Sequence, residues 1–475
     1  MRTIQEPARE LAVVGEYDVV VAGGGPAGIP AAVAAARAGA KTLLIERYGF
    51  LGGMATAGLI GPILGVRAGR SEEPIIGGIA EELCRRMESI GGARPFDEFV
   101  KKGSIPFEPE ALKLVADEIT LEAGVELRLH SWVADAVVDD GVLQALVLES
   151  KSGRQAVAGK VFVDATGDAD IVARADARFT KGRRCDGAMM AMGSIFHIGG
   201  VDEANLPTAD EMQAIMQMSG QAVDDGIIKT YNRGLGGKGS TLREGQRSIN
   251  ATRFGGDCTD VEDLTRGEIE VRRDTWDLIG FWRERVPAMG GVYLVQTPTN
   301  LGLRESRQMV GVERMVGDDI RQARRRDDAV ARAAYWIDIH CPLGRVKRDT
   351  HLCYKSCPND PPCQAYEEHY EELPGEDGKP NGPEGRASLH PKDGLWADVP
   401  YGALVSEDLI NLLAAGRCIS MDHQAMGAVR VMGTCMAIGQ AAGEAAAMAV
   451  EAEGHTRAVD VAELQRRLRA NGAPC

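Results

Sequence analysis

Apolar runs at the start of the chain predict a strand, a helix and a second strand. Residues 17–22, YDVVVA, form a short valine-rich run, as expected of an inner strand of a parallel sheet, which is apolar on both faces. The alanine-rich run at residues 31–38 ends at Gly39 and predicts a helix, and residues 41–45, KTLLI, predict the second strand. The pattern indicates a strand–helix–strand unit of a nucleotide-binding α/β fold.

Similar runs continue through the first part of the chain. Helices are predicted within residues 73–91 and over 109–123, and a buried strand over 160–164. Residues 125–130, 134–138 and 142–148 predict a small antiparallel sheet with a tight turn at residues 139–141.

The pattern changes at about residue 185 to short alternating runs, helices and polar loops. The earlier pattern returns with predicted strands at 397–405 and 409–414, a small-residue helix at 434–448 and a closing helix at 459–468. We therefore expect a discontinuous nucleotide-binding domain, residues 10–184 and 397–475, with a substrate domain, residues 185–396, inserted. A polar, cysteine-bearing surface insertion is expected at about 341–392.

A glycine-rich turn joins the first predicted strand to the first helix. Gly23, Gly24, Gly25, Pro26, Ala27 and Gly28 match the pattern GxGxxG. Gly23 permits the tight turn, Gly25 lets backbone amides approach a pyrophosphate, and Gly28 lets the helix pack closely on the strand. Glu46 follows the second strand, eighteen residues after Gly28, where a carboxylate reaches a ribose hydroxyl. This context predicts a bound adenine dinucleotide whose ribose carries no 2′-phosphate.

The charge of the chain narrows the choice of partners. Lys and Arg total 54 against 69 for Asp and Glu, a net charge of −15. Such acidity repels polyphosphate backbones and anionic lipids, so neither nucleic acid nor a membrane is expected as a partner. The opening residues hold no apolar leader and no run of about eighteen apolar residues occurs, so we expect a cytoplasmic protein.

Further glycine-containing segments follow the predicted strands. They are Gly52, Gly53 and Met54 in FLGGMATAG; Thr166, Gly167 and Asp168 in ATGD; and Gly416 and Arg417 after NLLAA. Small residues and backbone amides at the carboxyl edge of a parallel sheet suit a flat cofactor ring. A plain loop also uses glycines, and Thr166 also suits a helix cap, so both interpretations stay open. The amino end of the small-residue helix, at Val431, Gly433 and Thr434, suits a negatively charged group.

Arginines in LGLRESRQMVG are candidates for substrate contacts. Arg304, Glu305 and Arg307 follow a run that predicts a strand. Paired arginines suit a bound carboxylate or a buried ion pair with Glu305, and a salt-bridge cluster between domains is an equal alternative. A second GxGxxG match at residues 234–239 follows no apolar strand, so we expect a loop there and no second dinucleotide domain for NAD(P)H.

Residues 335–340, YWIDIH, predict a strand with Asp338 and His340 on one face, and a group of cysteines follows. The group consists of Cys341, Cys353, Cys357 and Cys363. Four thiols so close together suit zinc or an iron–sulfur cluster, but their spacing lacks a CxxC pair, and an ordinary cysteine-bearing loop is the favoured alternative. We therefore predict no metal.

Taken in order along the chain, these stretches resemble the FAD-dependent oxidoreductase family, whose fold is the two-domain FAD fold of glutathione reductase. The stretches are VVVAGGGPAG with Glu46, FLGGMATAG, VFVDATGDAD, LRESRQMVG, YWIDIH, VPYGALV, and NLLAAGRCIS through RVMGTCMAIGQAAG. The resemblance implies an α/β, FAD-binding Rossmann-like domain with an inserted α+β substrate domain. It implies FAD with its ribose at Glu46, its pyrophosphate at Gly25 and Gly28, and its adenine near Val133.

The resemblance also implies where the flavin ring lies. It places the ring among residues 52–54, the Gly416 and Arg417 turn, and residues 431–434, and it implies cofactor contacts at Arg47 and in ATGD. Gly402 stands where the family frequently has an arginine, which puts the substrate in doubt rather than the cofactor. No cysteine pair follows the first strand–helix–strand unit, which argues against a disulfide reductase.

These features predict an FAD-dependent dehydrogenase or oxidase. We expect it to remove a hydride from a carbon of a small polar substrate, with His340 and His423 moving the proton and Arg304 orienting the substrate. One alternative is a flavin-dependent reductase of an activated double bond. Another is an electron-transfer subunit in which the four cysteines hold an iron–sulfur cluster. A second copy of the chain or an electron-acceptor protein remains open as a partner.

Overall fold

The predicted strand–helix–strand unit is present in the computed structural model, which describes residues 2–5, 8, 10–184, 186–230, 235–342, 345–346, 349–350 and 391–475. The unit consists of β1 (Val13–Ala22), α1 (Gly28–Arg37) and β2 (Thr42–Ile45). β1 and β2 are parallel, with Val19 opposite Thr42. All four residues of β2 are buried, as expected for a strand with both faces covered.

A seven-stranded sheet forms the centre of the protein. Its order is β5-β2-β1-β8-β7-β6, and β18 also pairs with β8. The added strands are β5 (Glu126–Arg128), β6 (Trp132–Asp139), β7 (Val142–Ser150), β8 (Gly153–Asp164) and β18 (Leu412–Ala414). β5, β2, β1, β8 and β18 run parallel, whereas β7 and β6 continue the sheet antiparallel. The prediction that residues 125–130 belong to the antiparallel part is wrong, because β5 joins the parallel edge beside β2.

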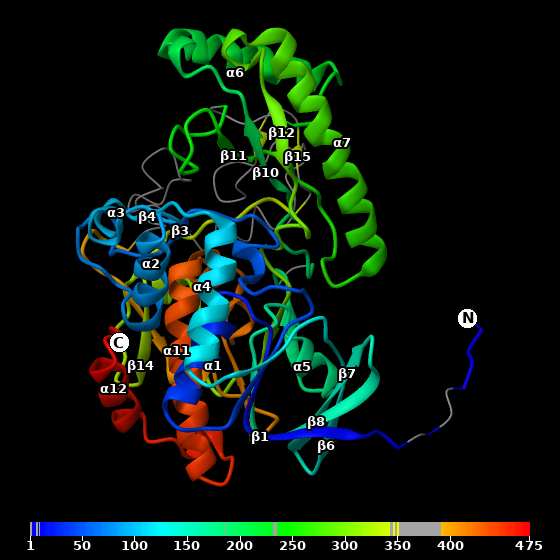
Figure 1. Ribbon diagram of the computed structural model, residues 1–475, viewed down its shortest axis with the longest axis vertical. Coiled ribbons are helices and arrows are strands. Elements are labelled where there is room, and N and C mark those ends of the chain that lie inside the picture. Colours follow the sequence, from blue (N-terminus) through cyan, green and yellow to red (C-terminus); the bar gives the residue numbers. More distant parts are fainter. Residues whose placement is uncertain are drawn as a thin grey trace.

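Close helix packing covers this sheet. α11 (Met432–Glu451) lies beside α1 (Figure 1). A Cβ on Gly439 would lie 2.0 Å from the carbonyl oxygen of Ala27, and one on Gly443 would lie 2.0 Å from that of Ala31. Glycine at both positions therefore lets the backbones of the two helices approach. The other helices around this part of the chain are α2 (Gly78–Ser89), α3 (Phe96–Lys102), α4 (Pro109–Glu122), α5 (Asp170–Arg174) and α12 (Val461–Ala470).

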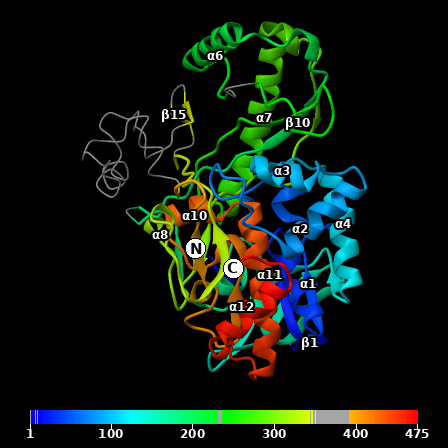
Figure 2. The ribbon, with the colours of Figure 1, turned by 90° about the vertical axis from the view of Figure 1, so that its left-hand side faces the viewer.

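A second group of elements has its own apolar core. A three-stranded antiparallel sheet has the order β11-β10-β12, from β10 (Ile195–Gly199), β11 (Arg247–Asn250) and β12 (Tyr293–Gln296). With α6 (Ala209–Asp224) and α7 (Val261–Arg285) it encloses buried residues that include Phe196 and Trp282. Figures 1 and 2 both show these elements at one end of the molecule, beyond the parallel sheet. The domain boundaries at 185 and 396 stay predictions.

The segment between this group and the end of the chain packs on the parallel sheet. Its elements are α8 (Gly317–Arg321), α10 (His423–Val429), β13 (Arg307–Met309), and the antiparallel pair of β14 (Ala329–Ala333) with β17 (Ala397–Pro400). β13 pairs antiparallel with β9 (Phe179–Lys181), which comes before the second group in the chain. Buried residues from Met309 to Ile339 belong to the same core as β1 and α11. The remaining short strands are β3 (Ile63–Leu64), β4 (Ser104–Ile105), β15 (Arg345–Val346) and β16 (Asp349–Thr350).

The strand predictions beside the candidate substrate residues are wrong. Residues 335–340 alternate between buried and half-buried positions, with Ile337 and Ile339 inside, but they form no strand. Alternation reports which side chains are buried, whereas a strand also needs a partner for its backbone. Arg304 likewise follows no strand, since β12 ends at Gln296 and β13 begins at Arg307.

Within the described ranges, no helix is both long and apolar enough to cross a membrane.

Candidate cofactor and substrate site

A cleft of about 300 Å³ opens at the carboxyl ends of β1, β2 and β8. Most of the predicted cofactor-binding residues line it: Gly23, Gly25, Pro26, Ala27, Glu46, Arg47, Gly53, Met54, Val133, Thr166, Gly167, Asp168, Gly416, Arg417 and Val431. Gly28, Gly52, Gly433 and Thr434 are not among its lining residues. Arg304 and His340 line the cleft, and His423 does not. Segments far apart in the chain thus meet at the edge of the sheet where ligands of parallel sheets bind.

Each glycine of the first turn is needed for a different structural reason. Gly23 has a φ of +97°, and a Cβ there would lie 2.4 Å from the carbonyl oxygen of Ala165. A Cβ on Gly28 would lie 1.7 Å from the carbonyl oxygen of Gly23, so Gly28 maintains the turn without lining the cleft. A Cβ on Gly25 would have no neighbour closer than the Cα of Gly53, at 3.7 Å. The fold therefore leaves room for a side chain at Gly25, and the absence of one keeps the backbone accessible from the cleft.

Glu46 is held rigidly at the end of β2. Its Oε2 accepts a hydrogen bond of 2.7 Å from the amide of Gly24, and its Oε1 accepts one of 3.0 Å from the amide of Tyr48. Burial raises the pKa of Glu46, although these amide donors oppose the shift. Each carboxylate oxygen can accept a second hydrogen bond, so the side chain retains capacity for hydroxyl groups.

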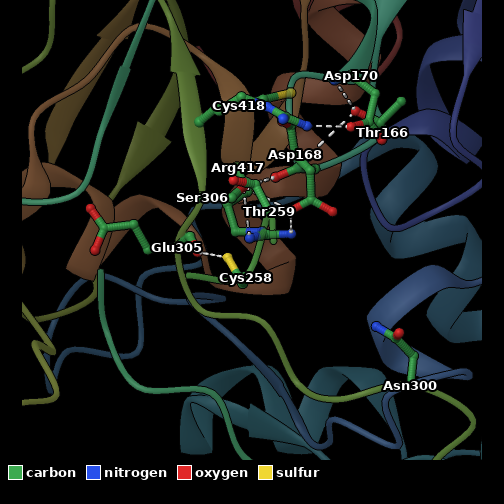
Figure 3. Close-up of polar contacts among 12 residues, drawn as sticks. Thr166, Asp168, Asp170, Cys258, Thr259, Asn300, Glu305, Ser306, Arg417 and Cys418 are labelled. Atoms are coloured by element: carbon green, nitrogen blue, oxygen red, sulfur yellow. Dashed lines mark hydrogen bonds and ion pairs between the residues drawn. The ribbon is translucent and has the colours of Figure 1, made fainter. Parts of the chain in front are cut away.

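An ion pair joins two of the predicted cofactor segments (Figure 3). Arg417 Nη2 lies 2.8 Å from Asp168 Oδ1, and both side chains are about nine-tenths buried. Ser306 Oγ donates to the same oxygen at 2.7 Å. Burial favours the neutral carboxyl, but the positive charge of Arg417 and the hydrogen bond from Ser306 hold the pKa of Asp168 below its ordinary value. The ATGD segment and the Gly416 turn are therefore linked through side chains.

Neighbouring polar groups complete this side of the cleft. The hydroxyl of Thr166 accepts a 3.0 Å hydrogen bond from the amide of Asp170, at the start of α5. Thr166 therefore lines the cleft and also bonds the first turn of a helix, and its contact with the cofactor stays a prediction. Asp170 pairs with Arg307. Burial, followed by the nearby charge of Asp168, raises the pKa of Asp170 to about 6.

A different set of charged side chains lines the cleft beyond this cluster. Asp338 Oδ2 lies 3.0 Å from Arg430 Nη2 and 3.3 Å from His340 Nε2. Arg304 donates to the carbonyl oxygen of Ala191 at 2.6 Å and contacts the Oδ1 of Asn250 at 3.4 Å. Arg304 therefore forms no ion pair with Glu305 or with another acid in the described part of the chain. We refer to Arg304, Asp338, His340 and Arg430 as the arginine–histidine cluster.

Burial decides the charge state of His340. Its pKa is lowered to about 3, first by burial and then by the positive charge of Arg304, which together outweigh the attraction of Asp338. The imidazole is therefore neutral at neutral pH. Asp338 stays ionised: burial favours its neutral form, but the contact with His340, followed by the positive charges of Arg430 and Arg304, holds its pKa well below the ordinary range. An ionised Asp338 accepts from Nε2–H of His340, and this contact assigns the lone pair to Nδ1. That Nδ1 is buried and has no hydrogen-bond partner among the described residues.

His423 lies away from the cleft lining, in a buried pair with Glu305. Its Nδ1 is 2.7 Å from Glu305 Oε2, and the side chains are 6% and 0% exposed. Glu305 Oε2 also accepts from the amide of Met190 at 3.0 Å. Glu305 therefore pairs with His423, and not with the arginines that the sequence analysis had considered as its partners. Figure 3 shows the Glu305 carboxylate directed away from the Arg417–Asp168 pair.

Sequence reasoning missed Arg430 and Asn250. Arg430 immediately precedes Val431, and its own side chain gave no signal of its role because Asp338, its partner, is 92 residues away. Asn250 lies at the end of β11, in a segment without a motif. Of the four clustered cysteines, Cys341 is buried, and Cys353, Cys357 and Cys363 lie outside the described residues. Across the described ranges, no group of three or more His, Cys, Asp or Glu residues is placed to hold a metal ion.

Comparison with known families identifies the family to which the chain belongs. Residues 18–468 match the family model described as FAD dependent oxidoreductase. The chain belongs to this family. It is therefore an FAD-dependent enzyme, and the cofactor and enzyme class predicted from the sequence are confirmed.

Curated relatives match parts of the chain. It is similar to digeranylgeranylglycerophospholipid reductase 1 of Methanopyrus kandleri, with 31% identity over 156 residues, 32% of this chain and 40% of the relative. It is also similar to thiamine thiazole synthase of Methanococcus vannielii, with 30% identity over 174 residues, 33% of this chain and 59% of the relative. The matched region thus spans well under two thirds of either relative. A solved geranylgeranyl bacteriochlorophyll reductase-like protein from Thermoplasma acidophilum aligns with 97% of this chain and 84% of its own, at 12% identity and a TM-score of 0.42.

Proposed function

We propose that this enzyme is a dehydrogenase or oxidase that removes a hydride from a carbon of a small polar substrate, an alcohol, an amine or a saturated C–C bond. Bound FAD supplies the hydride acceptor. The observation that carries the proposal is a neutral His340 in the cleft, whose buried Nδ1 has no partner among the described residues. An unprotonated nitrogen is what the oxidation of an alcohol or amine requires of a base, and Nδ1 must also become exposed to the cleft, because it is buried in this structure.

The predicted cofactor residues fit FAD. Gly25 leaves its backbone open toward the cleft, as an approaching pyrophosphate requires, and Glu46 is held at the end of the adjacent strand, as a ribose hydroxyl requires. We assign the pyrophosphate to the Gly23–Gly28 turn and the adenine to the neighbourhood of Val133. We assign the ring to Gly53, Met54, Gly416, Arg417 and Val431, with Gly52, Gly433 and Thr434 supporting them. Arg47 and the ATGD residues complete the assigned cofactor site.

We further propose that the fold follows glutathione reductase, with residues 185–396 as a substrate domain. The separate core around Phe196 and Trp282 supports this division. Substrate would lie against the arginine–histidine cluster, where Arg304 orients it. His423 is buried against Glu305, and neither residue lines the cleft, so proton transfer by His423 stays a prediction that the structure does not support.

Reduction of an activated double bond in the same cleft is the second candidate, because one of the relatives is named a reductase. That direction needs a proton donor beside the substrate. Because the pKa of His340 is lowered to about 3, the imidazole is almost entirely unprotonated at neutral pH and is a poor donor. The same low pKa also makes His340 a weak base, so its charge state alone does not decide between hydride removal and reduction.

The test is anaerobic mixing of the yellow enzyme with a panel of alcohols, amines and saturated acids while the flavin absorbance is followed. We expect one compound to bleach the flavin, and His340→Gln to slow the bleaching by about 100-fold or more with FAD retained. The control is His197→Gln. His197 is also a largely buried histidine with its pKa lowered, to about 4, and it does not line the cleft. Equal rates in wild type and His340→Gln would reject the base assignment, and a protein that takes up no FAD would reject the function.

A further inference from the structure

The arginine–histidine cluster carries more positive than negative charge. Arg304 and Arg430 line the cleft there, and Asp338 is the acid that lies among them. Asp338 already binds Arg430 and His340. Since His340 is neutral, two guanidinium groups face one carboxylate, and Arg253 adds a further positive charge that acts on Arg304.

The other acids that line the cleft are already bound to other groups. The carboxylate of Glu46 accepts hydrogen bonds from backbone amides. Asp168 pairs with Arg417, and Asp170 pairs with Arg307. Because each of these groups is held by other partners, none of them balances the charge of Arg304.

Burying a guanidinium without an acid is unfavourable, and the surroundings of Arg304 show that cost. Burial, and then the positive charges of Arg253 and Arg430, lower the pKa of Arg304 well below its ordinary value. Its hydrogen bonds to Ala191 and Asn250 hold the side chain in place but supply no negative charge. Bound negative charge at this position would relieve both the desolvation and the repulsion.

We infer that the substrate carries a carboxylate, which binds to Arg304 and Arg430 beside His340. The inference rests on the proposed function, because it places the substrate in the same cleft. A carboxylate fits for two reasons. Asp338 alone does not balance the positive charge of Arg304 and Arg430, and a carboxylate supplies negative charge there. The planar fork of an arginine also matches the two oxygens of a carboxylate. Arg430 is then a specificity-determining residue, together with Arg304.

The test measures binding of acetate, propionate and benzoate to the FAD-loaded enzyme, each paired with its primary amide. Titration calorimetry and the shift of the flavin absorbance report affinity without turnover. We expect at least one carboxylate to bind about tenfold or more tightly than its amide, and to weaken as chloride is raised. Arg304→Met and Arg430→Met are each expected to abolish this preference.

Two further variants sharpen the test. Arg466→Met removes an equivalent charge from a side chain on α12 that is 69% exposed, and it should leave the preference unchanged. Arg430→Lys keeps the charge but loses the fork, so it should retain part of the preference even where a methionine variant fails to fold.

The outcomes separate the two proposals. Equal binding of carboxylates and amides, absence of binding by every panel member up to its solubility limit, or an undiminished preference in both folded methionine variants would overturn the carboxylate site. The flavin spectra of the same samples report separately on the proposed function. Yellow protein without the preference would reject only the carboxylate, whereas colourless protein that takes up no FAD would reject both.

Discussion

Gly25→Ala isolates cofactor binding from folding, because it adds one methyl group where the fold leaves room. The nearest atom to the new Cβ would be Gly53 Cα at 3.7 Å, an ordinary van der Waals contact. The backbone of Gly25 is not in the left-handed region, so alanine can adopt it. We therefore expect the free energy of unfolding of the cofactor-free protein to change by less than about 1 kcal/mol.

The effect on FAD should be much larger. The methyl group would occupy the approach of the pyrophosphate to the backbone of the glycine turn. A hydrogen bond to a charged group is worth about 1.5–3 kcal/mol, so losing one weakens FAD binding by about 10- to 150-fold. Gly28→Ala would affect both properties, since its Cβ would lie 1.7 Å from a carbonyl oxygen and the helix would have to shift.

The assay removes FAD, titrates it back while flavin fluorescence is followed, and measures thermal unfolding of the cofactor-free protein. Gly237→Ala is the matched control. It places the same methyl group in the second GxGxxG match, with no atom within 4 Å and no contribution to the cleft lining. If Gly25→Ala binds FAD within about twofold of wild type, or if unfolding changes as much as binding, the assignment of the pyrophosphate to this turn is refuted.

Three further predictions concern packing, pH and the buried histidine pair. Gly439→Ala would place a methyl group 2.0 Å from the carbonyl oxygen of Ala27, so urea unfolding should show a loss of about 1–3 kcal/mol in the free energy of unfolding. Gly280→Ala, in open space on α7, should instead gain up to about 1 kcal/mol, and equal effects of the two changes would contradict the close packing of α1 and α11. The pKa of His340 is about 3 in the folded protein and about 6.5 in the unfolded protein, so its contribution to stability is complete above pH 6.5 and is lost as the pH falls toward 3. The His340→Gln variant should therefore lose less thermal stability than wild type between pH 7 and pH 4. The same dependence of thermal stability on pH in both proteins would contradict the lowered pKa. His423→Ala should lower the free energy of unfolding by about 1.5–3 kcal/mol, because Glu305 loses its 2.7 Å contact with the imidazole. Normal thermal stability together with lost turnover would instead support a role of His423 in proton transfer.

The nucleotide-binding part was predictable because its signals are local. β1, the glycine turn, α1 and β2 are consecutive, so the valine run, the glycine spacing and Glu46 each constrain the same short segment. The sequence also predicted the small-residue helix that became α11, but only the structure showed that its glycines pack against α1, at the other end of the chain. Prediction from the sequence failed where one pattern of apolar and polar residues is compatible with two structures. The alternation at residues 335–340 reports burial correctly but not strand pairing, and the strand near residue 126 reads the same in a parallel or an antiparallel neighbourhood.

By itself, then, the sequence determined that this protein is an α/β protein that binds FAD, and it predicted the glycine turn and the adjoining acid as the residues that hold the dinucleotide. Only the tertiary structure decided how the charged residues pair. Glu305 binds His423, 118 residues away, instead of the adjacent Arg304, and Asp338 binds Arg430, 92 residues away. The reason is physical: a turn is specified by backbone geometry within a few residues, whereas a buried charge takes whichever partner the packed elements bring within hydrogen-bonding distance.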